Sequence, residues 1–450
     1  MAHTNAAAGE STIRVAVVDG ARAAELRGVD IEIVPLGSGA PGAWRAEVVH
    51  ASVVGGAVEI DGRRASAFRL RSENVIRLNG RDYPAPLEIM RSGEGLVVVN
   101  ELRLEDYVVG VVRAEAGEKW PLEMLRAQAV VARTYAAYHR SIATGKPYHI
   151  LASTVHQQYA GRVAATSPIW GAVRDTAGQV LLWEGELFPA FYHTESGGYT
   201  EDPRMIFAAR NLPALKPVRC DFSVGSPHFY WNLDLRLDAL TDVLRKNNVD
   251  VGGVSAVEVS ERTPSLRAAL VTVHGARSSA RLRGNDFRRM LGYDRLKSTL
   301  FAVAMDGDWA HFSGRGYGHG AGMCQWGAKG MAEQGYSARK ILEFFYPGTT
   351  VGSPATITPA PANRVREGRH ACRRRDRRPA VSRGPPSRAE ALDRLRSRAR
   401  HQALERADHR ALRGPRADRP PRHRRRQLRA QADRAVRLGG ARARRLRRAR

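Results

Sequence analysis

In the first hundred residues, hydrophobic positions alternate with polar ones or form short apolar runs, which is the pattern of β-strands. Turn residues separate these runs, and the pair Asn79-Gly80 has the composition of a tight hairpin turn. The predicted strands are Ile13–Val18, Ile31–Pro35, Ala57–Ile60, Ala67–Arg71, Val75–Leu78, Leu87–Arg91 and Leu96–Asn100. Residues 13–103 are therefore predicted to be β-rich.

After residue 103 the apolar spacing changes to a helical period. A first helix is predicted from about Glu105 to Val112. Pro121 marks the start of a second helix, because the first turn tolerates the missing N–H of proline. The buried stripe of this second helix is predicted to be Leu122, Leu125, Ala129, Ala132 and Ala136, with Gly145 just beyond its end. Residues 114–120 then form a short loop between two helices.

The remainder up to residue 352 mixes both patterns. Residues 179–193 predict two strands with a tight turn at Gly185, whereas the proline-containing residues 213–235 resemble a loop. Within residues 254–305 we expect short strands and a helix at Gly284–Leu291 with Asn285 as its cap. A glycine-rich loop, a helix that ends near Gly335 and a helix capped by Ser337 follow. The predicted fold class is α+β: a β-rich N-terminal region, a helical hairpin, and further mixed strands and helices.

Charge alters this picture only at the end of the chain. The formal net charge of +27 lies almost entirely in residues 361–450, which contain 32 Arg, no Lys and 8 acidic residues. These residues also lack Phe, Trp, Tyr, Ile and Met, so they cannot bury enough apolar surface to offset chain entropy. Residues 353–450 are therefore predicted to be a disordered, Arg-rich tail. A nucleic-acid arm and the product of a shifted reading frame are alternatives, and no nucleic-acid function is expected.

Cysteine content and hydropathy exclude several classes of protein. The three cysteines form no CxxC pair, which indicates neither a disulfide framework nor a zinc finger, and a Cys220–Cys324 bridge is a less favoured alternative. No apolar run reaches the ~18 residues that a transmembrane helix needs. Residues 1–12 are predicted to be disordered and show no signal peptide, so the protein is either cytosolic or its export signal lies upstream of residue 1.

Glu115 is the strongest candidate for chemistry. Small neighbours leave room for a ligand, and Trp120 with the apolar helix faces would desolvate the carboxyl, raise its pKa and keep it a proton donor. Arg126 and Arg133 lie seven residues apart along one face of the following helix and would grip a polar substrate. The alternative is a solvated loop carboxylate, which is what most loop glutamates are.

Two later clusters offer polar and aromatic groups. Residues 192–200 begin with Tyr192 and His193 and are dense in hydroxyls, a composition that suits sugars and also an ordinary polar hairpin loop. The glycine-rich residues 316–326 contain His319, Gln325 and Trp326; they fit no phosphate-binding motif and predict either a groove-lining loop or a tightly packed turn. A glycosidase with two carboxylates would need a second acid from elsewhere, such as Asp175, Glu195 or Asp202.

Five segments, in this order, resemble the stage II sporulation protein D family, which includes the amidase-enhancer proteins. They are LEDYVVGVVRAE, WPLEMLRAQAVVARTYA, AFYHTESGGYTE, SPHFYW and GHGAGMCQWGAKGMAEQGYSARKILEFFYPGTTV. The resemblance covers residues 13–352 as one domain, with the catalytic groove in residues 104–352. It implies a secreted or membrane-anchored cell-wall protein, and the sporulation members act as lytic transglycosylases on peptidoglycan glycan strands.

The resemblance also implies roles for single residues. Glu115 matches the family's catalytic glutamate, Arg133 matches its substrate-binding arginine, and Arg126 stands where the family often has Lys. The remaining groove positions are expected to be Tyr192, His193, Ser196, His319, Gln325 and Trp326. Some members carry a zinc motif resembling HSTCGGHT, but Ser196 and Tyr199 replace its Cys and its second His, so no zinc and no other cofactor is expected.

Two functions remain open at this point. The first is lytic transglycosylation of peptidoglycan with Glu115 as the single acid and base. The second is a glycan-binding protein that enhances a separate cell-wall amidase and cleaves nothing. Retention of Glu115 and Arg133 favours the first. The expected location is extracytoplasmic, at the cell wall, and the expected partners are glycan strands and, for the second function, an amidase.

Overall fold

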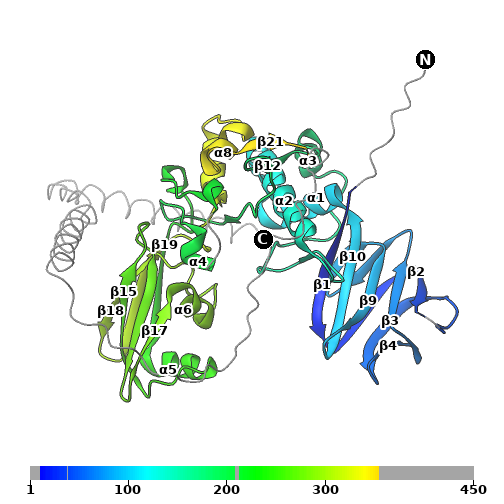
Figure 1. Cartoon of the computed structure of the whole chain (residues 1–450), viewed down its shortest axis with the longest axis horizontal. Helices are drawn as coiled ribbons and strands as arrows, with labels where there is room; N and C mark the ends of the chain where they lie inside the picture. Colours follow the sequence, from blue (N-terminus) through cyan, green and yellow to red (C-terminus); the bar gives the residue numbers. More distant parts are fainter. Residues whose placement is uncertain (1–10, 38, 208–211, 354–450) are drawn as a thin grey trace, which may run out of the picture. The chain divides into compact units, whose positions relative to one another are not determined.

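The computed structural model describes residues 11–353 except residues 38 and 208–211 (Figure 1). The alternating segments of the N-terminal region form one sheet of eleven strands, in which β1 pairs with β10 and, in parallel, with β11. Its strands are β1 Thr12–Ala21, β2 Ala23–Leu36, β3 Trp44–Val54, β4 Ala57–Ile60, β5 Arg63–Ala65, β6 Ala67–Arg71, β7 Val75–Leu78, β8 Arg81–Pro84, β9 Leu87–Ser92, β10 Gly95–Arg103 and β11 Ile150–Leu151.

Alternation identified most of these strands and one of their turns. Asn79 and Gly80 both have positive φ between β7 and β8, as a two-residue hairpin turn requires, so this predicted turn is confirmed. Strands β3, β5, β8 and β11 were not predicted. Thr12 was predicted to be disordered, but it pairs with Arg103 at the start of β1, so that boundary was placed too late.

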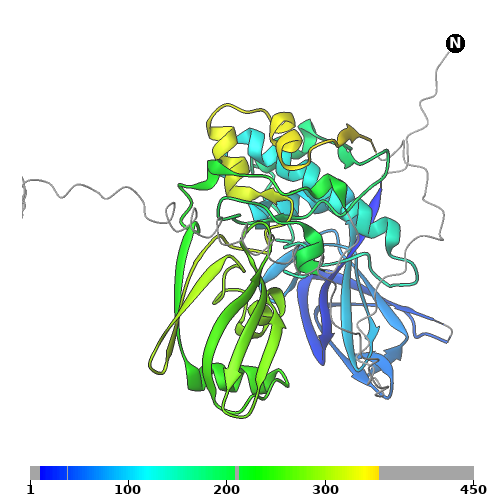
Figure 2. The same ribbon diagram turned by 60° about the vertical axis from the view of Figure 1, so that its left-hand side comes forward.

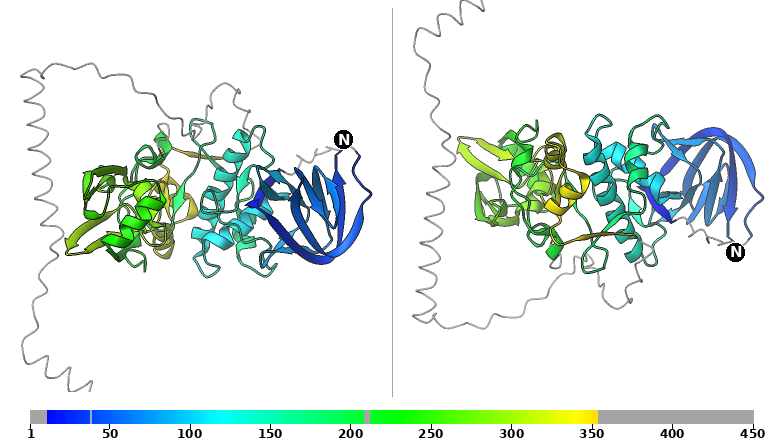
Figure 3. Two further views of the ribbon diagram at one scale, coloured as in Figure 1. Left: turned by 90° about the horizontal axis from the view of Figure 1, so that it is seen from below. Right: turned by 90° about the horizontal axis from the view of Figure 1, so that it is seen from above.

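Three helices follow the sheet: α1 Leu104–Glu115, α2 Leu122–Ile142 and α3 Ile169–Asp175. Helix α1 packs against α2 and against β1 and β10, an arrangement that Figure 3 shows from two sides. One face of α1 is buried from Leu104 to Val112, because its valines and Tyr107 recur at helical spacing. In α2 the predicted alanine stripe is buried, but Leu122 at the first turn is 45% exposed and does not belong to it.

The C-terminal described segment returns to these helices. It contains β20 Met323–Cys324, α7 Gln325–Glu333, α8 Ala338–Phe345 and β21 Thr350–Gly352. Strand β21 pairs with β12 (Val180–Leu182), and β20 pairs in parallel with β13 (Tyr192–His193). Ser337 caps α8 as predicted, since its hydroxyl accepts a hydrogen bond from the Lys340 N–H at 3.4 Å. One hydrophobic core runs from the sheet through α1 and α2 to α7 and α8.

A second core lies in residues 230–315, which are inserted between β13 and β20 (Figure 2). Its elements are β14 Tyr230–Arg236, α5 Leu237–Lys246, β15 Val254–Arg262, β16 Ala268–Gly275, β17 Ser279–Arg283, α6 Gly284–Leu291, β18 Phe301–Asp306 and β19 Trp309–Arg315. They form two three-stranded sheets, β14-β19-β18 and β15-β16-β17. The sequence analysis placed residues 213–235 in a loop and missed β14 and α5. Helix α6 has the predicted bounds, but its N-cap is Arg283 rather than Asn285.

Short elements connect the two cores. They are α4 Pro203–Phe207 and the 3₁₀ turns Pro213–Leu215 and Asp221–Ser223. No helix among the described residues is long and apolar enough to cross a membrane. The predictions for residues 1–10 and 354–450 lie outside the described residues. The α+β class, with a sheet-rich N-terminal region, is confirmed.

Candidate active site

Glu115 is the last residue of α1, not a loop residue as predicted. The helix continues past Val112 for about one more turn and ends at Ala116, whose N–H bonds to the Val112 carbonyl at 2.9 Å. A carboxylate at the C-terminal end of a helix faces the negative end of the helix dipole, which favours the protonated form. The position of Glu115 in its own helix thus already works against ionisation.

Burial acts in the same direction. Loss of solvent around the carboxyl raises the pKa of Glu115 above its ordinary value. Hydrogen bonding opposes this in part: Glu115 Oε1 accepts from the Gln158 backbone N–H at 2.7 Å, and the side chains of Tyr192 and Gln325 also favour the carboxylate. Because burial is the largest cause, the net pKa is raised. The raised pKa favours the protonated carboxyl, which can donate its proton, and the hydrogen bonds stabilise the carboxylate that remains.

A clamped segment supplies the Gln158 N–H. The Gln157 side chain accepts a hydrogen bond from the Tyr107 hydroxyl at 3.1 Å and donates to the Ala132 carbonyl at 3.3 Å. The segment lies directly on Gly110, where an added Cβ would fall 2.3 Å from a Tyr159 ring carbon. Glycine at position 110 is therefore what allows the segment to reach Glu115.

The parallel pairing of β13 with β20 brings the two later clusters to the same carboxyl. Gln325, which begins α7, donates from Nε2 to the Glu115 carbonyl at 3.4 Å and to Gln128 Oε1 at 3.4 Å. The Tyr192 hydroxyl is buried close enough to the Glu115 carboxyl to favour its ionised form, although the two groups do not meet the full geometry of a hydrogen bond. Burial raises the pKa of this phenol, so it remains protonated and can donate.

Four rings contact one another in succession, and we term them the aromatic row: Trp120, Trp326, His228 and Tyr317. The ring centroids are 5.4 Å apart for Trp120 and Trp326, 6.2 Å for Trp326 and His228, and 5.3 Å for His228 and Tyr317. The row begins in the residues that follow Glu115 and ends in the glycine-rich segment. All four rings are partly exposed, so they present both apolar faces and polar edges to solvent.

The structure does not bring the two predicted arginines to Glu115. Arg126 pairs with Asp175 and Glu123, and Arg133 is wholly buried and pairs with Glu105 through two hydrogen bonds of 2.8 and 2.6 Å. Among the described residues no hydrogen bond or ion pair joins either arginine to Glu115. Helical spacing correctly placed them on one helix, but acids from other segments neutralise both. The buried Arg133 guanidinium holds Glu105, and the substrate-binding role predicted for it stays a prediction.

Three other predicted groove residues are used internally. His193 is 4% exposed and its Nδ1 lies 3.1 Å from the Ala321 carbonyl. Ser196 is fully buried, and its hydroxyl accepts from the Gly198 N–H at 3.3 Å. Burial lowers the pKa of His319 to about 3, so this ring stays neutral. The structure thus brings Tyr192 and Gln325 to Glu115 and buries His193 and Ser196, while the binding roles of these residues and of His319 stay predictions.

The alternatives for metal binding and for a second acid can be compared with the same geometry. In the part of the chain that the structure describes, no three His, Cys, Asp or Glu side chains are grouped so that they could hold a metal ion. Cys220 and Cys324 are buried and unbridged. Asp175 pairs with Arg126 and Asp202 with Arg204, whereas Glu195 is buried and accepts from Ser223. None of the three acids is hydrogen-bonded to Glu115.

The sequence did not indicate that the Gln157-Gln158 segment and Gln128 belong to the site. It also did not indicate that Trp120 is part of a row of rings. Tandem glutamines ahead of a buried tyrosine were the available signal, but no periodic pattern links residues 152–168 to a neighbour. A largely buried acid bordered by amides and rings is typical of proteins that bind or act on saccharides.

Comparison with known proteins gives the family. A family model described as stage II sporulation protein matches residues 92–183, which include Glu115, and a domain of unknown function matches residues 218–322, close to the inserted second core. An uncharacterized protein of Brachyspira hyodysenteriae is 31% identical over 283 residues, which are 62% of this chain and 75% of that protein.

Two named relatives agree with this match. The stage II sporulation protein D of Bacillus amyloliquefaciens is 28% identical over 313 residues, 66% of this chain and 87% of that protein. The amidase enhancer of Bacillus subtilis is 30% identical over 289 residues, 54% of this chain, and the chain spans only 40% of that protein. The chain belongs to the stage II sporulation protein D family.

Proposed function

We propose that this protein cleaves the glycan strands of peptidoglycan by lytic transglycosylation, with Glu115 as the single general acid and base. Family membership supports a cell-wall-related role. The observation that carries the finer proposal is the raised pKa of the partly buried Glu115 carboxyl, which accepts a hydrogen bond from the Gln158 N–H at 2.7 Å. The proposal includes that the protein is exported from the cytoplasm and acts at the cell wall.

The reaction requires two proton transfers at one carboxyl. Protonated Glu115 gives its proton to the glycosidic oxygen as the bond from that oxygen to C1 breaks. The resulting carboxylate then takes the proton of the 6-hydroxyl of the same sugar, and that oxygen bonds to C1 to close an anhydro ring. Glu115 ends protonated, so no water is consumed and no second acid is needed. General acid and base catalysis of this kind contributes about 10²–10⁴-fold in rate.

Several contacts fit this cycle. The Gln158 N–H at 2.7 Å stabilises the carboxylate formed midway, and burial favours the protonated form at the start and the end. The Tyr192 phenol remains protonated beside the carboxyl and offers a further donor. The three candidate second acids have other partners, which agrees with a reaction that uses one acid.

The aromatic row supports a polysaccharide as the substrate. Pyranose rings have apolar faces that stack on aromatic side chains and hydroxyl edges that bond to amides and imidazoles. Trp120 follows Glu115 by five residues and Trp326 follows Gln325 directly, while His228 and Tyr317 continue the row. A chain of sugars is the ligand that matches a row of rings, since successive sugars occupy successive rings.

The test is product analysis with the full-length protein. Wild type is incubated with purified glycan strands, and mass spectrometry measures anhydro-sugar ends. Glu115→Gln retains the size of the side chain and an acceptor for the Gln158 N–H, so it should fold and lose about 10²–10⁴-fold in rate. Glu94→Gln, the same change at a fully exposed glutamate, is the control and should behave like wild type. Equal anhydro product from wild type and Glu115→Gln would reject the role of Glu115.

A second candidate is a glycan-binding enhancer of a cell-wall amidase. It is favoured by the 30% identity to the Bacillus subtilis protein named amidase enhancer. The same groove would then hold a strand without cutting it. Strand binding by wild type and Glu115→Gln alike, with no anhydro ends from either and faster release of peptides by an added amidase, would select this function.

A further inference from the structure

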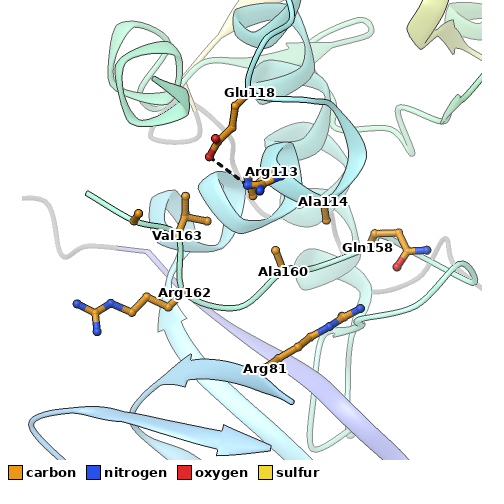
Figure 4. A pocket seen from close by; sticks show the side chains of 9 residues that line it. Arg81, Arg113, Ala114, Glu118, Gln158, Ala160, Arg162 and Val163 are labelled. Carbon is orange, nitrogen blue, oxygen red and sulfur yellow. Dashed lines mark ion pairs between the residues drawn. The ribbon is translucent and has the colours of Figure 1, made fainter. Parts of the chain in front are cut away.

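Three arginines from distant segments line a pocket next to the candidate acid (Figure 4). The pocket has a volume of about 770 Å³ and is lined by Arg81, Arg113, Ala114, Glu118, Gln158, Ala160, Arg162, Val163 and Ala164. Arg81 belongs to β8, Arg113 to the last turn of α1 and Arg162 to the segment that carries Gln158. Chain topology, not sequence proximity, brings these three residues to one pocket.

The pocket has an excess of positive charge. Arg113 is paired with Glu118, with its Nε 3.0 Å from the carboxylate, and Arg81 donates from Nη1 to the Tyr159 carbonyl at 3.0 Å. For the exposed Arg162 side chain, the described residues supply no hydrogen bond and no ion pair. One carboxylate therefore balances three guanidinium groups, and two positive charges remain to attract an anion.

The pocket and the candidate acid share their supports. Ala114 lines the pocket and directly precedes Glu115 in α1. Gln158 also lines the pocket, and its backbone N–H is the hydrogen-bond donor to the Glu115 carboxyl. The pocket thus shares Ala114 and Gln158 with the surroundings of Glu115, although Glu115 itself does not line it.

We propose that this arginine pocket binds a carboxylate carried by the glycan strand beside the linkage at Glu115. The inference rests on the proposed function, because it takes the strand to be peptidoglycan. Every second sugar of such a strand bears a lactyl ether whose carboxyl is either free or extended by a peptide that has carboxylates of its own. Guanidinium groups bind carboxylates through paired, directional hydrogen bonds, which neutral sugars do not need.

The pocket adds a charge requirement to the shape requirement of the aromatic row. A strand of uncharged sugars fills the row but leaves the pocket empty. A strand with carboxylates fills both, and its register is fixed because the carboxylates occur on alternate sugars. Arg81 and Arg162 thereby become specificity-determining residues that select charged strands and set which linkage meets Glu115.

The test compares charge-removing variants of the full-length protein in calorimetric binding. The probes are a muramyl tetrasaccharide with free lactyl carboxylates, the same compound with these groups converted to methylamides, and the same compound bearing stem peptides. Arg162→Gln is the main variant because the Arg162 side chain makes no hydrogen bond or ion pair with a described residue and acts on Asp82 only through its charge, and Arg81→Gln is the second. Arg339→Gln is the matched control, since Arg339 pairs with Glu343 in α8 and does not line the pocket. The Arg-rich tail is identical in all variants, so differences between them report on the pocket.

We expect Arg162→Gln to weaken binding of the free-carboxylate probe about three- to fivefold, with no change for the methylamide probe or for Arg339→Gln. A loss seen only with the peptide-bearing probe would support the pocket and identify the peptide as the source of the carboxylate. Wild-type affinities for both charged probes in Arg162→Gln and in Arg81→Gln would overturn the proposal.

The outcome is separable from that of the proposed function. If wild type forms anhydro ends but neither arginine variant affects binding, the pocket proposal fails and the reaction stands. If charged strands bind through the arginines but neither wild type nor Glu115→Gln yields anhydro ends, the pocket stands and the reaction fails. A wild-type protein that binds none of the three probes would overturn both.

Discussion

Arg126 and Arg133 are equivalent in the sequence and very different in the structure, and replacing each with alanine tests that difference. Both lie on α2, seven residues apart. The Arg126 side chain is 29% exposed and pairs with Asp175 and Glu123 at the surface. Arg133 is 0% exposed and is held by Glu105 and by backbone carbonyls.

The contacts set the magnitudes. Arg133 makes two charge-assisted bonds to Glu105 and a 3.1 Å bond to the carbonyl of Gln179, with longer bonds of 3.4 Å to Ala129 and Val173. Arg133→Ala leaves a void and unpaired acceptors, and breaking a buried pair costs about 3–5 kcal/mol. Because Glu105 is 38% exposed and water can reach it, we expect the lower half of that range. Arg126→Ala should cost about 0–1 kcal/mol, as exposed ion pairs do.

Urea unfolding followed by circular dichroism measures both changes in the free energy of unfolding. Glu105→Ala, alone and combined with Arg133→Ala, closes a double-mutant cycle that isolates the pair. The reasoning is refuted if Arg133→Ala is no less stable than Arg126→Ala. It is also refuted if Arg133→Ala remains as stable as wild type while its glycan binding is lost, because Arg133 would then act on the substrate directly.

Three further outcomes follow from the same contacts. Activity, measured as kcat/KM, should fall as pH rises through the raised pKa of Glu115. Tyr192→Phe should move this fall to higher pH, because it removes a group that favours the carboxylate of Glu115. A pH profile identical to that of wild type would exclude this coupling. Gly110→Ala should lower activity because the new Cβ displaces Tyr159 and with it the donor to Glu115, so unchanged kcat/KM would contradict the clamp. Ser337→Ala should cost about 0.5–1 kcal/mol of stability, measured by urea unfolding, with kcat unaffected; a larger loss would mean that Ser337 does more than cap α8.

Local patterns were sufficient for much of the fold. Strands β4, β6 and β7 have the predicted bounds, because each is short, alternating and closed by turn residues. Strand β3 was missed although it has eleven residues, since its sequence WRAEVVHASVV alternates only in part. Residues 230–236 were taken for a loop because prolines precede them, yet pairing with β19 makes them a strand. Propensity and spacing describe a segment, whereas the partner across the sheet decides whether it pairs.

In the candidate site, too, some features follow from the sequence and others only from tertiary contacts. The sequence by itself determined that an apolar helix leads to Glu115, that aromatic and amide residues occur in two later clusters, and that the chain has its family's motifs. Only the tertiary structure decided that Tyr192 and Gln325 reach Glu115, through the parallel pairing of β13 with β20, and that Arg133 turns inward to Glu105. Burial and ion pairing depend on residues that are distant in the chain, so no local pattern could reveal that one arginine of a matched pair is enclosed and the other exposed.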